Sequence, residues 1–178
     1  LHFAGLKSVS ESLTNPLEYW DVNLSGTKNL LSSMNEFNCK TLIFSSSATI
    51  YGSTVSFKIN EDHFINPINP YGKTKAAVEN LLTDLYQSDD KWSIISLRYF
   101  NPVGAHSSGM IGEYPLGIPN NLFPLISNVA AGSIEKLKVF GSDWPTTDGT
   151  GVRDYIHVND IAEGHCDAIK YLTEKKNG

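Results

Sequence analysis

Tyr71 and Lys75 are the two residues of this sequence whose types and spacing could do chemistry most directly. They are four residues apart at the start of a helix predicted over residues 71–87, and that spacing places two side chains on one helix face. A lysine ammonium there can lower the pKa of a nearby phenol from its usual value of about 10. Such a phenol can exchange a proton with the hydroxyl of a sugar or an alcohol at neutral pH. The pair therefore predicts acid–base chemistry centred on Tyr71.

A cluster of three serines, Ser45-Ser46-Ser47, precedes this pair and follows an apolar run, residues 41–44, that predicts a short buried strand. Asn101 follows a second apolar run, residues 93–99, in the same way. Ligands of parallel sheets bind beyond the carboxyl ends of the strands. Serines at the end of a strand often serve only to form a turn, so the cluster alone does not define a site.

Strand-like apolar runs alternate with helical patterns along the whole chain. Strands are predicted at residues 1–4, 41–44, 93–99 and 137–140, with a turn at residues 101–104. Helices are predicted over residues 16–37, over 71–87 with Asn69 as N-cap and Pro70 as first residue, over 120–131, and over 159–173. The alternation predicts an α/β fold with a doubly wound parallel sheet, of the Rossmann-like kind.

The composition is that of an ordinary globular protein with a net charge of −5. This charge offers no basic surface for nucleic acid, and no apolar run approaches the roughly 20 residues of a membrane span. Cys39 and Cys166 are expected to be buried thiols of a reducing compartment, which predicts a cytoplasmic protein. His157 and His165 have no third ligand nearby and are expected to be packed or capping histidines, so no metal site is predicted.

The two ends of the sequence predict that the chain is the middle of a longer protein. It begins with Leu1 rather than Met, and it stops at Gly178, where a connection to another strand is expected. The glycine-rich phosphate loop of a dinucleotide site is not found, because no strand leads into the glycines at 109, 112 and 117. We therefore expect an incomplete Rossmann-like domain with part of a smaller substrate domain.

Several ordered segments carry a resemblance to a known family. They are residues 2–7, residues 23–27, the serine segment 44–52, the Tyr71/Lys75 pair, residues 98–105, residues 119–122, and residues 148–158 with Gly149-Thr150-Gly151-Val152-Arg153-Asp154-Tyr155. Together they resemble the extended short-chain dehydrogenase/reductase superfamily and, within it, the UDP-glucose 4-epimerase family. The resemblance runs the length of the chain. It implies an isomerase of galactose metabolism that interconverts UDP-glucose and UDP-galactose through a transient 4-keto sugar, with NAD as cofactor and a UDP-hexose as substrate.

The resemblance also implies roles for individual residues. Tyr71 would be the catalytic base and, on return, the acid; Lys75 would lower its pKa and bind the nicotinamide ribose; Ser47 would hydrogen-bond the reacting oxygen, a role that Thr49 could share. The cofactor-binding positions implied are Phe3, Ala4, Gly5, Lys7, Asn23, Ser47, Tyr71, Lys75 and Phe100. The substrate-binding positions implied are Ser47, Tyr71, Asn101, Asn121, Leu122, Lys138, Val139, Phe140 and Arg153.

Arg153 has two interpretations, a diphosphate ligand or a member of a surface ion pair with Asp154 or Asp160. The planar guanidinium suits a diphosphate, because it donates two parallel hydrogen bonds. By the same resemblance, residues 1–104 are part of the NAD-binding domain. Residues 105–178 are mostly the substrate-binding region, interleaved with the last strand and helix of the NAD-binding domain.

Other functions remain open at this point. A nucleotide-sugar 4,6-dehydratase would need an Asp-Glu pair directly after the serine, where this chain has Ala48 and Thr49. Another nucleotide-sugar epimerase, or a non-catalytic NAD-binding scaffold on the same fold, is also possible, although such scaffolds usually lack the Tyr/Lys pair. Family members are typically dimers, so the helices at 16–37 and 71–87 are candidate contacts in a homodimer. As an isolated fragment, the chain is expected to be inactive.

Overall fold

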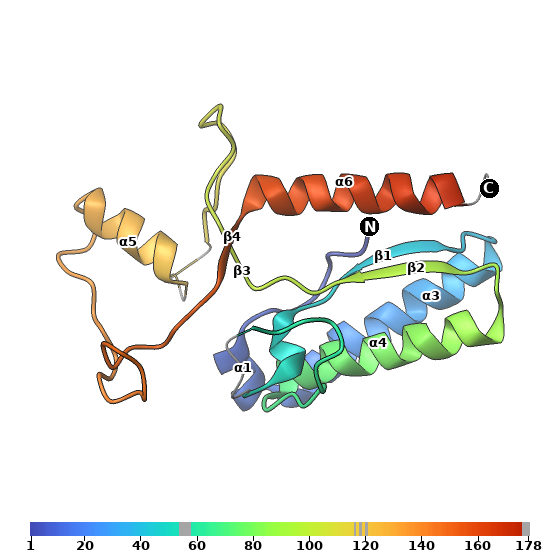
Figure 1. The fold of residues 1–178 in the computed structure, drawn as a ribbon, viewed down its shortest axis with the longest axis horizontal. Coiled ribbons are helices and arrows are strands. Elements are labelled where there is room, and N and C mark those ends of the chain that lie inside the picture. Colours follow the sequence, from blue (N-terminus) through green and yellow to red (C-terminus); the bar gives the residue numbers. More distant parts are fainter. Residues whose placement is uncertain (54–57, 116, 118, 120, 176–178) are drawn as a thin grey trace. The chain divides into compact units, whose positions relative to one another are not determined.

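The computed structural model describes residues 1–53, 58–115, 117, 119 and 121–175, and it divides the chain into two compact units (Figure 1). Unit 1 comprises residues 1–100 together with the end of the chain from Gly164, and unit 2 comprises residues 101–163. The predicted division lay at residue 104 instead, and the binding functions assigned to the two parts stay predictions.

The sheet of unit 1 is parallel, as the alternation of strands and helices predicts. Strand β1 (Thr41–Ser45) pairs in parallel with β2 (Ser93–Leu97), with Thr41 opposite Ser93. On the other side of β1, His2 forms a single parallel bridge with Phe44. Parallel neighbours require a crossover, which here is the long helix α4 (Pro70–Ser88).

Helices cover both faces of this sheet, because the side chains of β1 alternate between the two faces. Leu42 and Phe44 pack against α4 and against helix α3 (Gly26–Glu36). Ile43 points the other way, into a cluster with Ala168 and Leu172 of helix α6 (Val158–Lys175). The layers of Figure 1 follow this pattern, with α3 and α4 on one side of the strands and α6 on the other. The doubly wound arrangement is therefore present.

Helix α4 begins where its sequence predicts. The side chain of Asn69 accepts a hydrogen bond from the amide of Gly72 at 2.8 Å, and Pro70 occupies the first turn. Proline is favoured at that position because its missing N–H has no partner there in any case. The region predicted as one helix over 16–37 is a run of α2 (Pro16–Tyr19), a π-helical segment (Trp20–Ser25) and α3.

Unit 2 contains a second small parallel sheet, of β3 (Asn101–Val103) and β4 (Tyr155–His157), and helix α5 (Leu122–Ala130). Gly104 follows β3 with a φ of 94°, and a Cβ there would lie 2.3 Å from Nε2 of His157. Glycine suits this position, because a side chain is strained at this φ and its Cβ would have to displace the His157 ring. His157 is exposed, and its Nδ1 accepts from the amide of Asn159 at 3.2 Å at the start of α6, so it takes the capping role of the two that were predicted.

The structure corrects several predictions. Residues 1–4 pair only through His2 and form no strand. Residues 137–140 form no strand either: Val139 and Phe140 are exposed, and an exposed apolar run has nothing to pair or pack with. Residues 101–104 were expected to be a turn, but Asn101–Val103 is a strand. The strand predicted over 93–99 ends at Leu97.

Further differences concern the helices and the cysteines. Helix α1 (Val9–Thr14) was not predicted, although Ser8 caps it. Helix α5 begins at Leu122, two residues after its predicted start, and Asn120 itself lies outside the described residues. Both Cys39 and Cys166 are exposed, so their prediction as buried thiols is wrong. Within the described residues, no helix is long and apolar enough to cross a membrane.

The core between α3, α4 and β1 predicts a large effect for a single truncation. Leu82 of α4 is 3% exposed and belongs to this core. Leu82→Ala should lower the free energy of unfolding by about 3 kcal/mol, because it removes buried methyl groups and leaves a cavity. The measurement is urea denaturation, with Leu13→Ala as the matched control, because Leu13 is 62% exposed in α1. Equal effects of the two substitutions would show that this packing does not stabilise unit 1.

Candidate functional site

At the N-terminal end of α4, one face of the helix places Tyr71 and Lys75 against the serine segment, as their spacing predicts. Both side chains are buried, and so is Ser47, the last residue of the cluster. Ser47 has extended backbone angles and caps the 3₁₀ helix Ala48–Tyr51, where its hydroxyl accepts from the amide of Thr49 at 3.2 Å. The hydroxyls of Ser47 and Thr49 are 2.8 Å apart. Three of the predicted catalytic groups thus share one buried site in unit 1.

Lys75 is held by the backbone of the serine segment. Its Nζ donates to the carbonyl oxygen of Ser45 at 2.8 Å, and it lies 5.9 Å from the ring centroid of Tyr71. Burial lowers the pKa of Lys75 to about 8, because desolvation disfavours the ammonium. The lysine therefore carries its charge at neutral pH and loses it in mildly alkaline solution.

The predicted effect of Lys75 on Tyr71 is wrong for this structure. Burial raises the pKa of the Tyr71 phenol, and the hydrogen bond with Ser47 acts against that increase. The phenol of Tyr99 raises the pKa further through charge repulsion. Desolvation exceeds the other effects, so the free site favours the neutral phenol and Ser47 is the side chain that opposes this preference.

Asn23 organises the loop that follows His2. Its amide accepts from the backbone N–H of Leu6 at 2.8 Å, donates to the Leu6 carbonyl at 3.0 Å, and donates to the hydroxyl of Thr74 in α4 at 3.1 Å. Gly5, with a φ of 156°, passes so close that a Cβ would lie 2.9 Å from Asn23 Oδ1 and 3.9 Å from Lys75 Nζ. The loop thus runs beside Lys75 with no side chain in between. This open backbone fits the approach of a nicotinamide nucleotide.

The other predicted cofactor positions of unit 1 are on its surface. Phe3, Ala4, Lys7 and Phe100 are all exposed. Phe3 packs its ring against His165, with centroids 4.8 Å apart, and Tyr99 packs on the same histidine. His165 is buried there, which makes it a packed histidine as predicted.

Unit 2 contains a cavity of about 490 Å³ that gathers five of the predicted substrate positions. Its lining includes Asn101, Asn121, Leu122, Phe140 and Arg153, together with the aromatic rings of Trp144 and Tyr155. Lys138 and Val139 are not in the lining. The sequence did not predict Trp144 or Tyr155 here, although Tyr155 lies two residues from Arg153.

Polar groups of this cavity are partly engaged by the protein itself. Asn101 donates from its side chain to the Asp154 carbonyl at 2.8 Å, and the amide of Asn121 donates to Glu113 at 3.3 Å. Arg153 donates only to the carbonyl of Val152, at 2.8 Å, among the bonds of the described residues, and none of the ion pairs found there includes it. The ion-pair interpretation of Arg153 is therefore not supported, and the guanidinium remains open to a ligand.

The sequence assigned no individual role to three residues that are linked at the catalytic segment: Ser46, Glu79 and Arg98. Glu79 is buried and forms an ion pair with Arg98, and the hydroxyl of Ser46 donates to Glu79 Oε1. A signal was available for one of them. Glu79 follows Lys75 by four residues and so lies on the helix face that Tyr71 and Lys75 define.

Known proteins similar to this chain identify its family. The NAD dependent epimerase/dehydratase family model matches residues 1–178. The chain is 54% identical over 178 residues to UDP-glucose 4-epimerase 4 of Oryza sativa subsp. japonica, covering 100% of this chain and 48% of that protein. It is 55% identical over 170 residues to UDP-glucose 4-epimerase of Bacillus subtilis, covering 96% of this chain and 50% of that protein.

Solved structures give the same result. The UDP-glucose-4-epimerase of Stenotrophomonas maltophila with bound NAD and formylated UDP-arabinopyranose matches with a TM-score of 0.93 and 50% identity, covering 98% of this chain and 52% of that chain. The UDP-glucose 4-epimerase of Bifidobacterium longum in complex with NAD⁺ and UDP matches with a TM-score of 0.91 and 51% identity, covering 95% and 51%. The chain belongs to the NAD dependent epimerase/dehydratase family. It spans about half the length of the relatives that it matches.

The lowered pKa of Lys75 predicts a pH-dependent effect of Lys75→Met in the nucleotide-free protein. Below pH 8 the folded protein bears the full cost of a buried ammonium; between about 8 and the unfolded value of 10.5 that cost disappears as the folded lysine loses its proton. The stability of the parent relative to the variant should therefore rise by about 2–3 kcal/mol across this window. The lost bond to Ser45 affects the variant equally at every pH.

Urea denaturation at pH values from 7 to 10.5 measures this difference. Lys73→Met serves as the control, because Lys73 is exposed on the same turn of α4. A constant difference between parent and Lys75→Met over the whole range would contradict the assignment of a desolvated lysine.

Proposed function

We propose that the protein containing this chain epimerises a UDP-hexose at C4 with NAD as cofactor, interconverting UDP-glucose and UDP-galactose. The observation that carries the proposal is the buried contact of Tyr71, Lys75 and Ser47 in a chain that is 54% identical to UDP-glucose 4-epimerase 4 of rice. Residues outside this chain complete such a protein, because the chain covers only about half of its relatives. The chain alone is expected to be inactive.

The chemistry explains why a phenol with these neighbours is suitable. The C–H bond at C4 of a hexose is not acidic, so inversion by simple proton abstraction is a poor route. Oxidation of C4 to a ketone removes the stereocentre, and reduction on the opposite face restores it inverted. NAD supplies this chemistry when bound, since it takes up the C4 hydride and returns it. Asn23, Lys75 and the open backbone at Gly5 would hold its nicotinamide end.

The residues of the chain then have separate tasks. Tyr71 takes the proton of the C4 hydroxyl and later returns it, at its phenol oxygen. Ser47 donates a hydrogen bond toward the phenol oxygen of Tyr71 and so stabilises the deprotonated phenol. Lys75 uses one of its three N–H donors on Ser45, so two donors remain for ribose hydroxyls.

Unit 2 would bind the nucleotide part of the substrate. Arg153 suits the diphosphate because its donors point in parallel, and no carboxylate of the described residues pairs with it. Phe140 and Trp144 add apolar surface to the same cavity, which suits a flat base. Lys138 and Val139 are kept as proposed contacts on the strength of the resemblance alone.

The alternative functions are less well supported. A 4,6-dehydratase would need acidic side chains where Ala48 and Thr49 follow Ser47. A non-catalytic scaffold would not need the buried Tyr71 and Lys75. We also propose a homodimer through the outer faces of α2, α3 and α4, supported by the exposed apolar residues Leu17, Leu30 and Tyr86. The predicted cytoplasmic location is part of the same proposal.

Tyr71→Phe tests the catalytic role in the full-length protein. Turnover of UDP-galactose should fall by roughly 10²–10⁴-fold, because the substitution removes the acid–base group and leaves the ring. Proton NMR of the anomeric signals measures conversion, and the bound NAD content should stay unchanged. Tyr114→Phe, at a tyrosine that is 92% exposed, is the matched control.

Two results would contradict the proposal. Near-normal turnover of Tyr71→Phe would remove the role given to this phenol. A parent protein that leaves UDP-galactose unchanged would exclude this substrate, and formation of a 4-keto-6-deoxy sugar would favour the dehydratase.

A further inference from the structure

Helix α4 contacts the serine segment at three successive points along one face. Tyr71 faces Ser47, whose side chain opposes the rise in the pKa of this phenol, Lys75 donates to the Ser45 carbonyl, and Glu79 accepts from the hydroxyl of Ser46. The three helix residues are spaced by four, so they form a single row on the helix. The proposed chemistry uses only the first two contacts. The third one, with Glu79, has no task in it.

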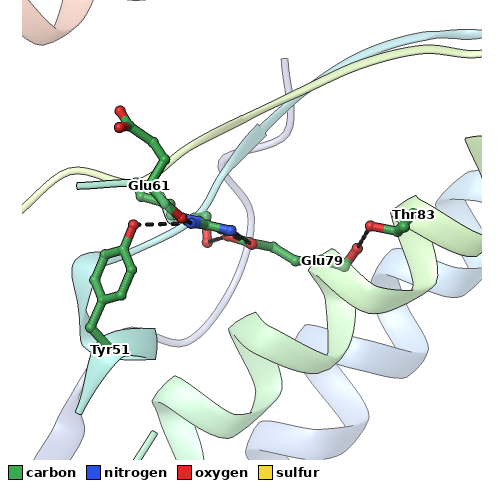
Figure 2. Close-up of polar contacts among 6 residues, drawn as sticks. Tyr51, Glu61, Glu79 and Thr83 are labelled. Atoms are coloured by element: carbon green, nitrogen blue, oxygen red, sulfur yellow. Dashed lines mark hydrogen bonds and ion pairs between the residues drawn. The ribbon is translucent and has the colours of Figure 1, made fainter. Parts of the chain in front are cut away.

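Glu79 is fixed by a bidentate ion pair rather than by Ser46 alone. Arg98 Nη2 lies 2.6 Å from Glu79 Oε2, and Arg98 Nε donates to both carboxylate oxygens at 3.1 Å. Arg98 is fixed in turn, since its Nη1 donates to the hydroxyl of Tyr51 at 2.9 Å and to the carbonyl of Glu61 at 3.0 Å. Figure 2 shows Glu79 reaching from its helix toward Tyr51 and Glu61, while the hydroxyl of Thr83 bonds the backbone carbonyl of Glu79.

The geometry of an extended chain connects this pair to the catalytic serine. Ser47 has φ −154° and ψ 145°, and in such a conformation neighbouring side chains point to opposite sides. The hydrogen bond from Ser46 to Glu79 therefore fixes the backbone from which the Ser47 side chain extends on the other side, and the bonds of the Ser47 hydroxyl to Thr49 set its direction from there. Tyr51, at the end of the 3₁₀ helix that Ser47 caps, contacts the same arginine. Both ends of the turn around Ser47 are thus attached to one ion pair.

We propose that Glu79 and Arg98 are positioning residues that aim the hydroxyl of Ser47 at Tyr71 by holding Ser46 and Tyr51. This inference rests on the proposed function for its kinetic consequences only. A buried ion pair by itself is weak evidence for stability, because desolvation offsets much of the attraction. A role in positioning explains why a buried ion pair is found next to the catalytic segment.

Ser46→Ala is the most selective test in the full-length protein. It removes the bond to Glu79 but leaves the Glu79–Arg98 pair and the packing in place. Turnover should fall by roughly tenfold to a hundredfold with KM, bound NAD and melting temperature nearly unchanged, because a small misplacement of a catalytic group is costly. The control is Thr83→Ala, since the Thr83 hydroxyl bonds the backbone carbonyl of Glu79 and not its carboxylate, so the substitution should leave turnover unchanged.

The pH dependence separates positioning from mere stability. Ser47 opposes the raised pKa of Tyr71, so a misdirected Ser47 should move the limb of the pH–rate profile that reports Tyr71 to higher pH. Lys75 and Tyr99, the other titratable groups that influence or face Tyr71, are the same in both proteins. A purely structural defect would lower the amplitude of the profile without moving the limb.

A second variant tests the role of Glu79 itself. Glu79→Asp keeps the charge for Arg98 but shortens the side chain by one methylene, so it should lose Ser46 and reproduce the Ser46→Ala profile. Combining the two substitutions should add little to either alone, because both remove the same contact. Additive effects would overturn the proposal.

The phenol of Tyr71 can also be titrated directly, by the ultraviolet absorbance of the phenolate in the parent minus that in Tyr71→Phe. An upward shift of this titration in Ser46→Ala supports the proposal even if UDP-galactose is not the substrate. An unchanged titration, or a limb that stays in place while turnover and melting temperature fall together, overturns it. An inert parent protein with a shifted phenol would refute the proposed function and not the positioning.

Discussion

Burial of the polar face of α4 against the serine segment is the constraint on which the site depends. Tyr71, Lys75 and Glu79 are taken out of water in one row, and an unpaired polar group in that position would cost several kcal/mol. Lys75 and Glu79 each have a hydrogen-bond partner on the opposing segment, and the Ser47 side chain opposes the rise in the pKa of Tyr71, so the burial is tolerated. The same contacts fix the orientation of the groups, and stability and catalytic geometry therefore have a common origin here.

The cost of this burial is visible in the ionisation of the two groups proposed to act. Desolvation lowers the pKa of Lys75 and raises that of Tyr71, so in the free protein both move toward their neutral forms. A simple tyrosine–lysine pair would shift the phenol the other way. Groups that stabilise the deprotonated phenol therefore become decisive, and the Ser47 side chain is one that lowers the pKa of Tyr71.

Local sequence signals predicted the parts of the fold that depend on neighbours in the chain. Asn69 and Pro70 mark the start of α4, and the pair at Tyr71 and Lys75 lies on one buried face. Helix α1 had such a signal too, because Ser8 is followed three residues later by Glu11, a capping pattern that was overlooked. The apolar run 137–140 misled, since its composition resembles a strand and only a pairing partner could make it one.

What the sequence could not supply is the set of contacts made across long separations. Ser46 and Glu79 are 33 residues apart and Glu79 and Arg98 are 19 apart, so only the crossover through α4 brings them together. The helical spacing places Glu79 on the catalytic face, but it does not tell which residue faces it. In the parallel pairing of β1 and β2, Ser45 lies opposite Leu97. The next residues along the two strands, Ser46 and Arg98, therefore leave the sheet side by side. Arg98 therefore reaches Glu79 because of strand register, a property that no local pattern encodes.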